Sequence, residues 1–107
     1  MWNEPTKSIL EQIPKLNATE EIPAKDKIIY LHFFIGASDW YVAEFNGDDI
    51  FFIYAILGGD FFNSEWGYVS FSDLKNINID NFEVDYDLYW EPCKAGEIEN
   101  IKQGMGW

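Results

Sequence analysis

The chain contains no arginine, one cysteine and one histidine, and each shortage argues against a class of function. Without arginine, it lacks the side chain that grips carboxylate or phosphate groups through two parallel hydrogen bonds. Cys93 has no second cysteine with which to form an internal disulfide, which favours a reducing compartment. With His32 as the only imidazole, a zinc or iron site would need carboxylates for nearly all its ligands. We therefore expect no metal and no cofactor.

Long apolar runs are also missing. No stretch approaches the roughly 20 residues that cross a bilayer as a helix. The first residues, MWNEPTKS, lack the basic segment and apolar core of a signal peptide. We therefore predict a cytoplasmic protein that does not bind membranes.

What the chain has in excess is negative charge and aromatic side chains. Its 107 residues suit a single domain, residues 1–107, and the aromatic content of 19% argues against disorder. Aspartate and glutamate number 19 against 7 lysines, which gives a net charge of −12. Such a charge repels phosphate backbones, so direct nucleic-acid binding is not expected, and it attracts proteins with a basic surface. The competing interpretation is that the acidity only keeps an aromatic-rich domain in solution.

Residues 27–57 predict three antiparallel strands, which organise the rest of the chain. Residues 27–35 alternate between an apolar face and a face that carries His32, which is typical of a strand. A four-residue loop at 36–39 leads to a second strand at 40–45 and places Phe33 opposite Val42. A slip of one residue would instead place His32 opposite Glu44, so the register decides whether those two groups meet.

The second connection, residues 46–49, contains an Asn-Gly pair. A two-residue turn there would place Glu44 opposite Asp49, which is an unfavourable pair of like charges. We therefore predict a four-residue loop with Phe45 opposite Ile50. Residues 50–57 are almost continuously apolar, as in a strand that is covered on both faces.

The remaining elements are predicted from shorter patterns. A helix at 6–12 is expected to end at Pro14, and a strap at 15–26 to be anchored by Leu16 and Ile22. Strands are predicted at 65–70 and 82–90, a helical turn at 73–76 capped by Ser70 or Ser72, and a helix at 95–103. Phe61 and Phe62 are expected to fold back onto the sheet. The fold class is therefore α+β: a single domain with a five-stranded antiparallel sheet, mostly a meander, and short N-terminal and C-terminal helices.

Several short motifs carry a resemblance to a known family. They are Tyr30-Leu31-His32-Phe33-Phe34, Asp39-Trp40-Tyr41, Glu44-Phe45, Glu65-Trp66-Gly67-Tyr68 and Asp87-Leu88-Tyr89-Trp90. In type and spacing they resemble the DUF2958 family, over most of the chain. That family has no assigned function, and its genes often lie in bacterial plasmids, conjugative elements and phages. The resemblance implies a bacterial or mobile-element origin and supplies no catalytic residues.

The candidate site is drawn from titratable and aromatic side chains around the sheet. A histidine beside carboxylates is suited to general-base chemistry, but no serine, threonine or cysteine nucleophile lies near His32 in the sequence. A satisfied histidine on an aromatic sheet face is the competing interpretation, and most of the aromatic residues are expected to be core. No catalytic residue is assigned. The predicted ligand or partner surface comprises His32, Asp39, Trp40, Tyr41, Glu44, Glu65, Trp66 and Tyr68.

Two functional hypotheses follow. The first is a non-catalytic protein-interaction module, with a partner that handles nucleic acid, and in its sharpest form a mimic of DNA whose rows of carboxylates imitate phosphates. The second is a small-molecule-binding or enzymatic domain that uses the His32 and aromatic face. It requires His32 to be partly exposed in a concave pocket, within hydrogen-bond reach of a carboxylate.

Overall fold

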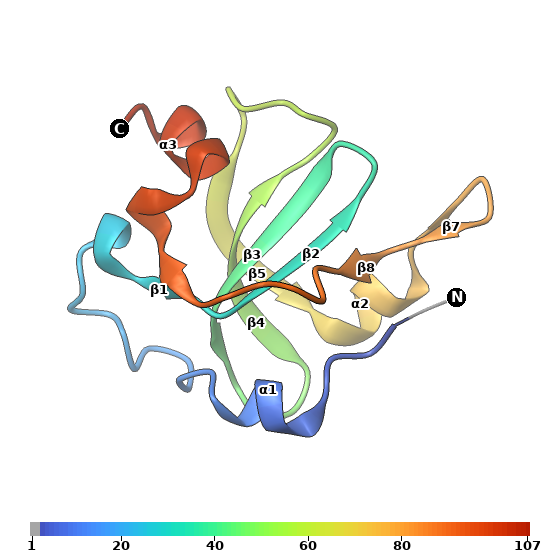
Figure 1. Ribbon diagram of the computed structural model, residues 1–107, viewed down its shortest axis with the longest axis horizontal. Helices are drawn as coiled ribbons and strands as arrows, with labels where there is room; N and C mark the ends of the chain where they lie inside the picture. Colours follow the sequence, from blue (N-terminus) through green and yellow to red (C-terminus); the bar gives the residue numbers. More distant parts are fainter. Residues whose placement is uncertain (1–2) are drawn as a thin grey trace.

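A computed structural model describes residues 3–107 and shows an α+β domain built on one antiparallel sheet (Figure 1). The sheet has five strands in the order β5-β4-β3-β2-β8. Four of them follow one another along the chain as a meander, as predicted, and β8 adds beside β2. The strands are β2 (Leu31–Ile35), β3 (Ser38–Phe45), β4 (Ile50–Ile56), β5 (Glu65–Ser70) and β8 (Asp85–Tyr86).

The register of β2 against β3 differs from the prediction by two residues. The connection is a two-residue turn, Gly36-Ala37, and it pairs Phe33 with Trp40 rather than with Val42. Gly36 has a φ of 53°, a conformation that glycine adopts without strain at the first position of a tight hairpin turn. Because the shift is an even number of residues, the side chains of β2 and those of β3 up to Val42 keep their predicted faces. His32 consequently lies opposite Tyr41, and the alternative pairing with Glu44 is wrong.

The β3–β4 connection has the predicted loop, residues 46–49, and avoids the pairing of Glu44 with Asp49. The Asn46 side chain closes this loop by accepting hydrogen bonds from the backbone N–H groups of Asp48, Asp49 and Ile50. The ladder above it is irregular. Val42 pairs with Ile53 but Glu44 pairs with Phe52, so a bulge inserts Ala43, and Phe45 lies opposite Phe51 instead of Ile50.

The bulge moves Glu44 to the other face of the sheet. By strict alternation from Val42, Glu44 would point into the core that contains Val42 and Phe51. The inserted residue instead places Glu44 opposite Phe52, on the face that carries Tyr41 and Ala43. A carboxylate is thereby kept out of an apolar core where it would have no partner.

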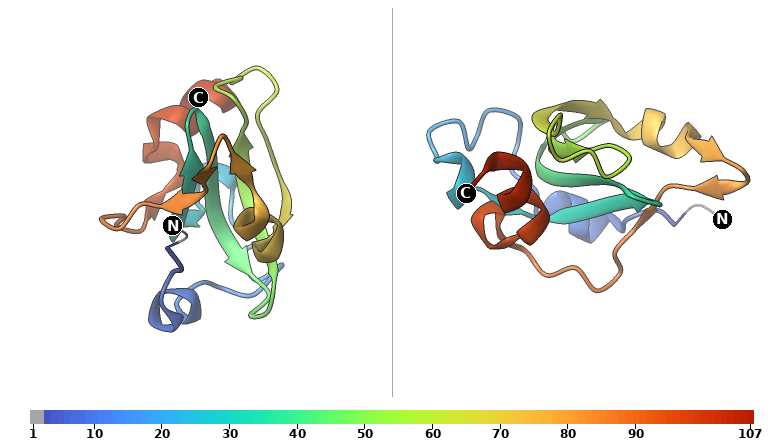
Figure 2. Two further views of the ribbon diagram at one scale, coloured as in Figure 1. Left: turned by 90° about the vertical axis from the view of Figure 1, so that its right-hand side faces the viewer. Right: turned by 90° about the horizontal axis from the view of Figure 1, so that it is seen from above.

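Each face of the sheet has its own core. Helix α1 (Lys7–Glu11) and helix α2 (Phe71–Asn76) cover the first face, where the central buried side chains are Leu31, Phe33, Val42, Phe51, Ile53, Leu74 and Val84. The second face is covered by the C-terminal segment, comprising β9 (Cys93–Lys94), η2 (Ala95–Glu97) and helix α3 (Glu99–Met105) (Figure 2). Its buried side chains are Ile29, Tyr41, Ala43, Tyr54, Ile56, Ala95, Ile98 and Ile101. The inward positions predicted for Ile98 and Ile101 are confirmed.

The N-terminal segment agrees with the prediction in outline but not in its anchor. Helix α1 is capped by Thr6, whose side chain accepts a hydrogen bond from the Ile9 N–H. The strap that follows ends in η1 (Ala24–Asp26) and β1 (Ile28–Ile29), and β1 pairs with β9. Leu16 is only partly buried and Ile22 is exposed, so neither fastens the strap as expected. Its buried residue is Thr19, which contacts Glu44 and Lys27.

The fourth strand and the capped helical turn are confirmed as β5 and α2. Ser70 caps α2 by accepting a hydrogen bond from the Asp73 N–H. In the loop before β5, Phe61 packs against the second core as predicted, whereas Phe62 is almost fully exposed. No helix within residues 3–107 has the length and apolarity needed to span a membrane.

The strand predicted at 82–90 is wrong in its length. The chain instead forms a separate hairpin of β6 (Asn78–Ile79) and β7 (Phe82–Glu83), followed by the two-residue strand β8. Asp80 and Asn81 both have positive φ, as a two-residue type I′ hairpin turn requires. The first two residues of the predicted strand, Phe82 and Glu83, belong to the hairpin as β7. Strand β8 is then followed by a turn in which the Trp90 N–H donates a hydrogen bond to the Asp87 carbonyl, so the strand does not reach residue 90.

Candidate functional site

His32 and Asp39 are brought together by the β2–β3 hairpin. Asp39 pairs with Phe34 and His32 pairs with Tyr41, so the two side chains are diagonal neighbours on the second face. The His32 Nε2 atom lies 2.7 Å from Asp39 Oδ1. A carboxylate in this position orients the ring and favours a proton on Nε2. The hydrogen-bonded pair required by the second hypothesis is therefore present.

The surroundings of His32 are aromatic. Its ring stacks on Tyr41 at 4.4 Å between centroids and 8° between planes, and the rings of Trp90 and Phe34 lie at 5.3 and 5.5 Å. The side chain is 15% exposed, and within residues 3–107 its Nδ1 atom has no hydrogen-bond partner. None of the hollows described below is lined by His32. The pair is therefore ordered but lies outside those concavities.

Tyr41 provides the hydroxyl group of this cluster, and it is held in the protonated form. Burial raises the pKa of Tyr41 to about 12, the hydrogen bond from Asn100 lowers that pKa, and the Asp39 carboxylate raises it. The Asn100 Nδ2 atom donates to the Tyr41 hydroxyl over 3.0 Å. A phenol with so high a pKa is a poor nucleophile at neutral pH. Within the described residues, no group of three or more histidine, cysteine or acidic side chains is placed to hold a metal ion.

Glu44 was predicted to lie on the ligand or partner surface, but in the structure it is buried and binds the N-terminal strap. Its side chain is buried and accepts hydrogen bonds from the backbone N–H groups of Asn17 and Thr19 and from the Thr19 hydroxyl. Lys27 donates to the Thr19 hydroxyl and to the Thr19 carbonyl. Thr19 thus links Glu44 to Lys27. Glu44 and Lys27 together hold the strap against β3.

The other members of the predicted surface do not converge on His32. Trp40 is buried in the first core, on the opposite face of the sheet from His32. Glu65, Trp66 and Tyr68 lie on β5, which is separated from β2 by two strands. There Phe52, Trp66 and Tyr68 form what we call the aromatic row, in which the Phe52 ring stacks on Trp66 at 5.5 Å and lies tilted against Tyr68 at 5.2 Å between centroids. Of the predicted set, the hairpin unites only His32, Asp39 and Tyr41.

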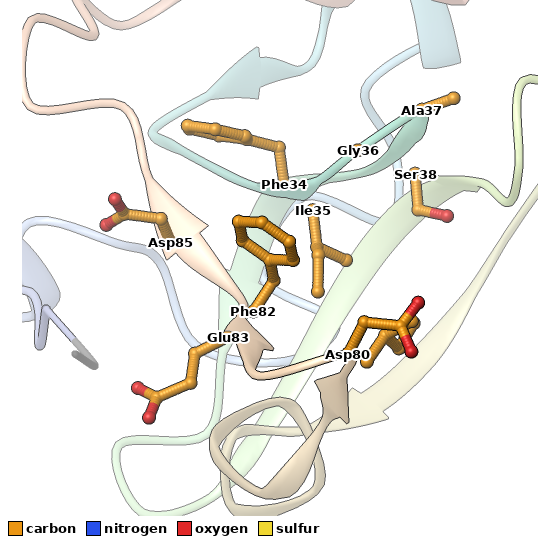
Figure 3. Close-up of a pocket in the computed structure, with 10 residues that line it drawn as sticks. Phe34, Ile35, Gly36, Ala37, Ser38, Asp80, Phe82, Glu83 and Asp85 are labelled. Atoms are coloured by element: carbon orange, nitrogen blue, oxygen red, sulfur yellow. The ribbon is translucent and has the colours of Figure 1, made fainter.

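A large concavity lies elsewhere, beside the β2–β3 turn. A hollow of about 640 Å³ separates this turn from the β6–β7 hairpin, and a second of about 400 Å³ adjoins it along residues 85–89. Phe34 and Asp85 line both hollows, so we treat the two as one edge groove. Figure 3 shows Phe82 beside Ile35 in the first hollow, with carboxylates at its periphery. The edge groove is lined by Phe34, Ile35, Gly36, Ala37, Ser38, Ile79, Asp80, Phe82, Glu83, Asp85, Tyr86, Asp87, Leu88 and Tyr89.

The edge groove combines exposed apolar side chains with acids. Phe82 is 70% exposed and Tyr89 is 90% exposed, and Ile79 and Leu88 are also mostly exposed. Along this stretch the apolar residues alternate with Asp80, Glu83, Asp85 and Asp87. Sequence reasoning missed the groove because the alternation at 82–90 was interpreted as one half-buried strand. The Asp-Asn pair at 80–81, which suits a tight hairpin turn, was the available signal.

No protein-family model, curated protein or solved structure matches this chain. The resemblance to the DUF2958 family therefore remains a prediction that rests on the motifs alone. The site has to be interpreted from its own geometry.

Proposed function

We propose that this domain is a non-catalytic protein-interaction module whose partner presents a basic surface. The observation that carries the proposal is the edge groove, where large apolar side chains stay exposed between carboxylates. A highly charged domain gains no solubility from exposing phenylalanine and tyrosine in one place, and such patches mark interaction sites. Exposed aromatic anchors surrounded by charge are also typical of protein-binding surfaces.

The distribution of charge supports a basic partner. Lys75 is the single lysine between residues 28 and 93, and it contacts Glu4 and the Phe71 ring. The other lysines lie at the two ends of the chain, several of them on the elements around η1 and α3. Among residues 3–107, the lining of the edge groove therefore contains acids and no lysine. Complementary charge of this kind accelerates encounter and fixes the orientation of a partner.

The groove fits a protein better than a small molecule. A pocket for a small molecule encloses most of the ligand surface within walls that are themselves buried. Here the side chains of Ile79 and Phe82, which form one wall, are more than half exposed to solvent. A macromolecular partner would bury these walls on binding.

The His32–Asp39 contact favours a second candidate, a small-molecule-binding or enzymatic domain that uses this face of the sheet. An oriented imidazole is a suitable general base. The aromatic enclosure of His32 and the high pKa of Tyr41 weigh against this candidate, because no activated nucleophile lies in the cluster. We therefore rank it second.

A nucleic-acid-handling partner encoded by a host or mobile element remains part of the first proposal, and so does a cytoplasmic location, which the free thiol of Cys93 supports. The DNA-mimic form of the proposal needs rows of available carboxylates. Asp39, Glu44, Asp49 and Asp60 all accept hydrogen bonds from within the domain. Because these carboxylates are already bonded within the domain, we favour binding of the partner in the edge groove over a row of carboxylates that imitates DNA phosphates.

Site-specific cross-linking tests the proposal. A photoreactive phenylalanine analogue is placed at Phe82, at Tyr89 or, as an exposed control remote in sequence, at Ile22, and the protein is illuminated in a lysate of the source cells. We expect one protein to be cross-linked from both groove positions and not from Ile22. That protein is then purified, and its binding to the wild type and to Phe82→Ser and Asp80→Asn is measured across a salt series.

The two variants separate the two contributions. Phe82→Ser removes an apolar anchor, and Asp80→Asn removes one charge while keeping a residue type that tolerates positive φ. Both are expected to weaken binding, and raising the salt concentration is expected to weaken the wild-type complex. Identical products from Ile22 and the groove positions, or full binding by Phe82→Ser, would overturn the proposal.

A further inference from the structure

Strand β5 is an open edge of the sheet. It is the last strand in the order β5-β4-β3-β2-β8, and nothing else within residues 3–107 pairs with its outer side (Figure 2). It pairs with β4 over all six of its residues without a register shift. A regular edge of this length presents unpaired backbone groups on which another extended chain can be added.

The hydrogen-bond pattern identifies the residues whose backbone faces outward. The Phe71 N–H donates to the Asp49 carbonyl, and in an antiparallel ladder such contacts recur at every second residue. Along the β4–β5 register this directs the N–H and C=O groups of residues 65, 67 and 69 toward β4. The N–H and C=O groups of Trp66 and Tyr68 therefore point away from the sheet.

The opposite edge of the sheet is protected, and the comparison is informative. Strand β8 has only two residues, and its Tyr86 N–H is occupied by the side chain of Asp85. Strand β5 lacks most of the usual protective features: it contains no proline, its ladder has no bulge, and no lysine or arginine occurs between residues 28 and 74. Its one charged side chain is the acidic Glu65 at its first position.

Side chains on both faces of β5 leave room for those of an added strand. On one face, the aromatic row presents Tyr68, which is 61% exposed. On the other face, Gly67 lies between Glu65 and Val69, and a Cβ atom built on Gly67 would meet nothing within 4 Å. The side chains of an added strand point alternately to the two faces. On one face they would contact the aromatic row, and on the other they would enter the free space beside Gly67.

We propose that the outer edge of β5 is a strand-addition site for an extended segment in which lysine or arginine alternates with apolar residues. Glu65 on the strand and the net charge of −12 favour a cationic segment. The same net charge disfavours a second copy of this chain, because two domains of equal negative charge repel each other on approach. This site lies on the opposite edge of the sheet from the edge groove and does not depend on it.

The test uses a synthetic peptide, acetyl-Thr-Lys-Val-Lys-Val-Lys-Val-Thr-amide, and the full chain labelled with nitrogen-15. We expect saturable shifts of the Trp66 and Tyr68 amide resonances and slower hydrogen exchange at both amides. A peptide with glutamate in place of lysine is the charge control. A peptide of unchanged charge, N-methylated at its central amides, is the backbone control, and both control peptides are expected to lose binding.

A pair of variants at one position separates the backbone from the side chain. Tyr68→Ala keeps the outward N–H, and Tyr68→Pro removes it at an edge position where proline is tolerated. We expect Tyr68→Pro to bind the peptide about tenfold more weakly than Tyr68→Ala does, because it loses a donor to the added strand. If Tyr68→Pro does not fold, the N-methylated peptide gives the same comparison on the wild-type protein.

The outcomes are distinct. Absence of saturable shifts at Trp66 and Tyr68, equal binding of the glutamate peptide, or equal binding of the N-methylated peptide overturns the proposal. A concentration-dependent dimer that Tyr68→Pro abolishes would identify a second copy as the occupant and would also overturn it. Cross-linking from Phe82 is unaffected by any of these results, so the edge-groove proposal stands or fails separately.

Discussion

Glu44 on β3 and Thr19 in the N-terminal strap are joined by two hydrogen bonds, one to the Thr19 N–H at 3.0 Å and one to its hydroxyl. They lie 25 residues apart in the chain, and both are buried. The contact exists because the bulge at Ala43 turns Glu44 toward the strap. A carboxylate that accepts hydrogen bonds from several backbone N–H groups of a strap holds the strap in place, as the carbonyl groups of a neighbouring strand would.

Glu44→Ala is therefore expected to destabilise the domain strongly. It leaves the buried N–H of Thr19 without an acceptor and also removes the acceptor of the Asn17 N–H, and each unpaired buried donor costs about 1–3 kcal/mol. Urea unfolding measures the effect, and we expect the free energy of unfolding to fall by about 3 kcal/mol. Glu20→Ala, at an exposed position in the same strap, is the control. A loss equal to that of Glu20→Ala would show that the strap is held by other contacts.

Gly104→Ala is expected to destabilise the domain even though alanine favours helices. A Cβ atom on Gly104 would lie 2.3 Å from both the Ser64 Oγ atom and the Tyr54 hydroxyl, which are hydrogen-bonded to each other at 2.5 Å. Such overpacking costs about 1–3 kcal/mol, more than the helix preference of about 1 kcal/mol restores. Thermal unfolding is the measurement, and Gly67→Ala, which adds a methyl group in open space, is the matched control. Equal melting temperatures for the two variants would contradict the close packing of α3 on Tyr54.

The raised pKa of Tyr41 predicts a loss of stability in alkali. Burial, opposed in part by the Asn100 hydrogen bond, raises this pKa from 10.0 to about 12, so the folded state favours the protonated phenol. The folded and unfolded states bind the Tyr41 proton equally below pH 10, but between about pH 10 and pH 12 the unfolded state releases it more readily. The contribution of Tyr41 to stability is therefore complete below the unfolded pKa and is lost as the pH rises through the folded pKa.

Urea midpoints measured from pH 9 to pH 12 on the wild type and on Tyr41→Phe test this prediction. The wild type is expected to lose more stability over that range than the variant, which has no phenol to ionise at this position. Ultraviolet titration should show a tyrosine that ionises near pH 12 in the wild type and is missing from Tyr41→Phe. Parallel stability curves for the two proteins would refute the assignment.

Phe82→Ser and Tyr89→Ser are expected to leave stability almost unchanged. Both side chains are mostly exposed, so their truncation removes little buried area, and we expect shifts within about 0.5 kcal/mol. Phe51→Ser, in the first core, is the contrasting variant and is expected to unfold the domain. Denaturant unfolding distinguishes the two classes. A large loss of stability in Phe82→Ser would mean that this side chain serves the fold and not a partner.

The sequence alone was sufficient to predict a five-stranded antiparallel sheet that is mostly a meander, and the faces of its regular strands. Alternation with a period of two assigns Phe33 to one face and His32 to the other whatever the register, because an even slip preserves both faces. The presence of helices α1 and α3 followed from equally local signals, and so did a serine cap for α2, where the structure selects Ser70 over Ser72.

The candidate site was predictable only in part. Whether His32 meets Asp39 depends on the two-residue turn at Gly36-Ala37, and the chain tolerates a longer loop with the same faces. The predicted set also included side chains on both faces and on β5, which no local pattern could separate. The edge groove was not predicted, because hairpin formation at 78–83 and a strand at 82–90 are both compatible with the same alternation.

What the sequence by itself determined, then, is the four-stranded meander, the alternation of faces along its regular strands and the strong negative charge, because these depend on neighbouring residues and on composition. The tertiary structure decided the rest. The bulge at Ala43 places Glu44 under the strap, and the early end of β8 opens the groove beside Phe34. Both depend on how segments far apart in the chain satisfy each other's buried polar groups and apolar surface, which a local pattern does not encode.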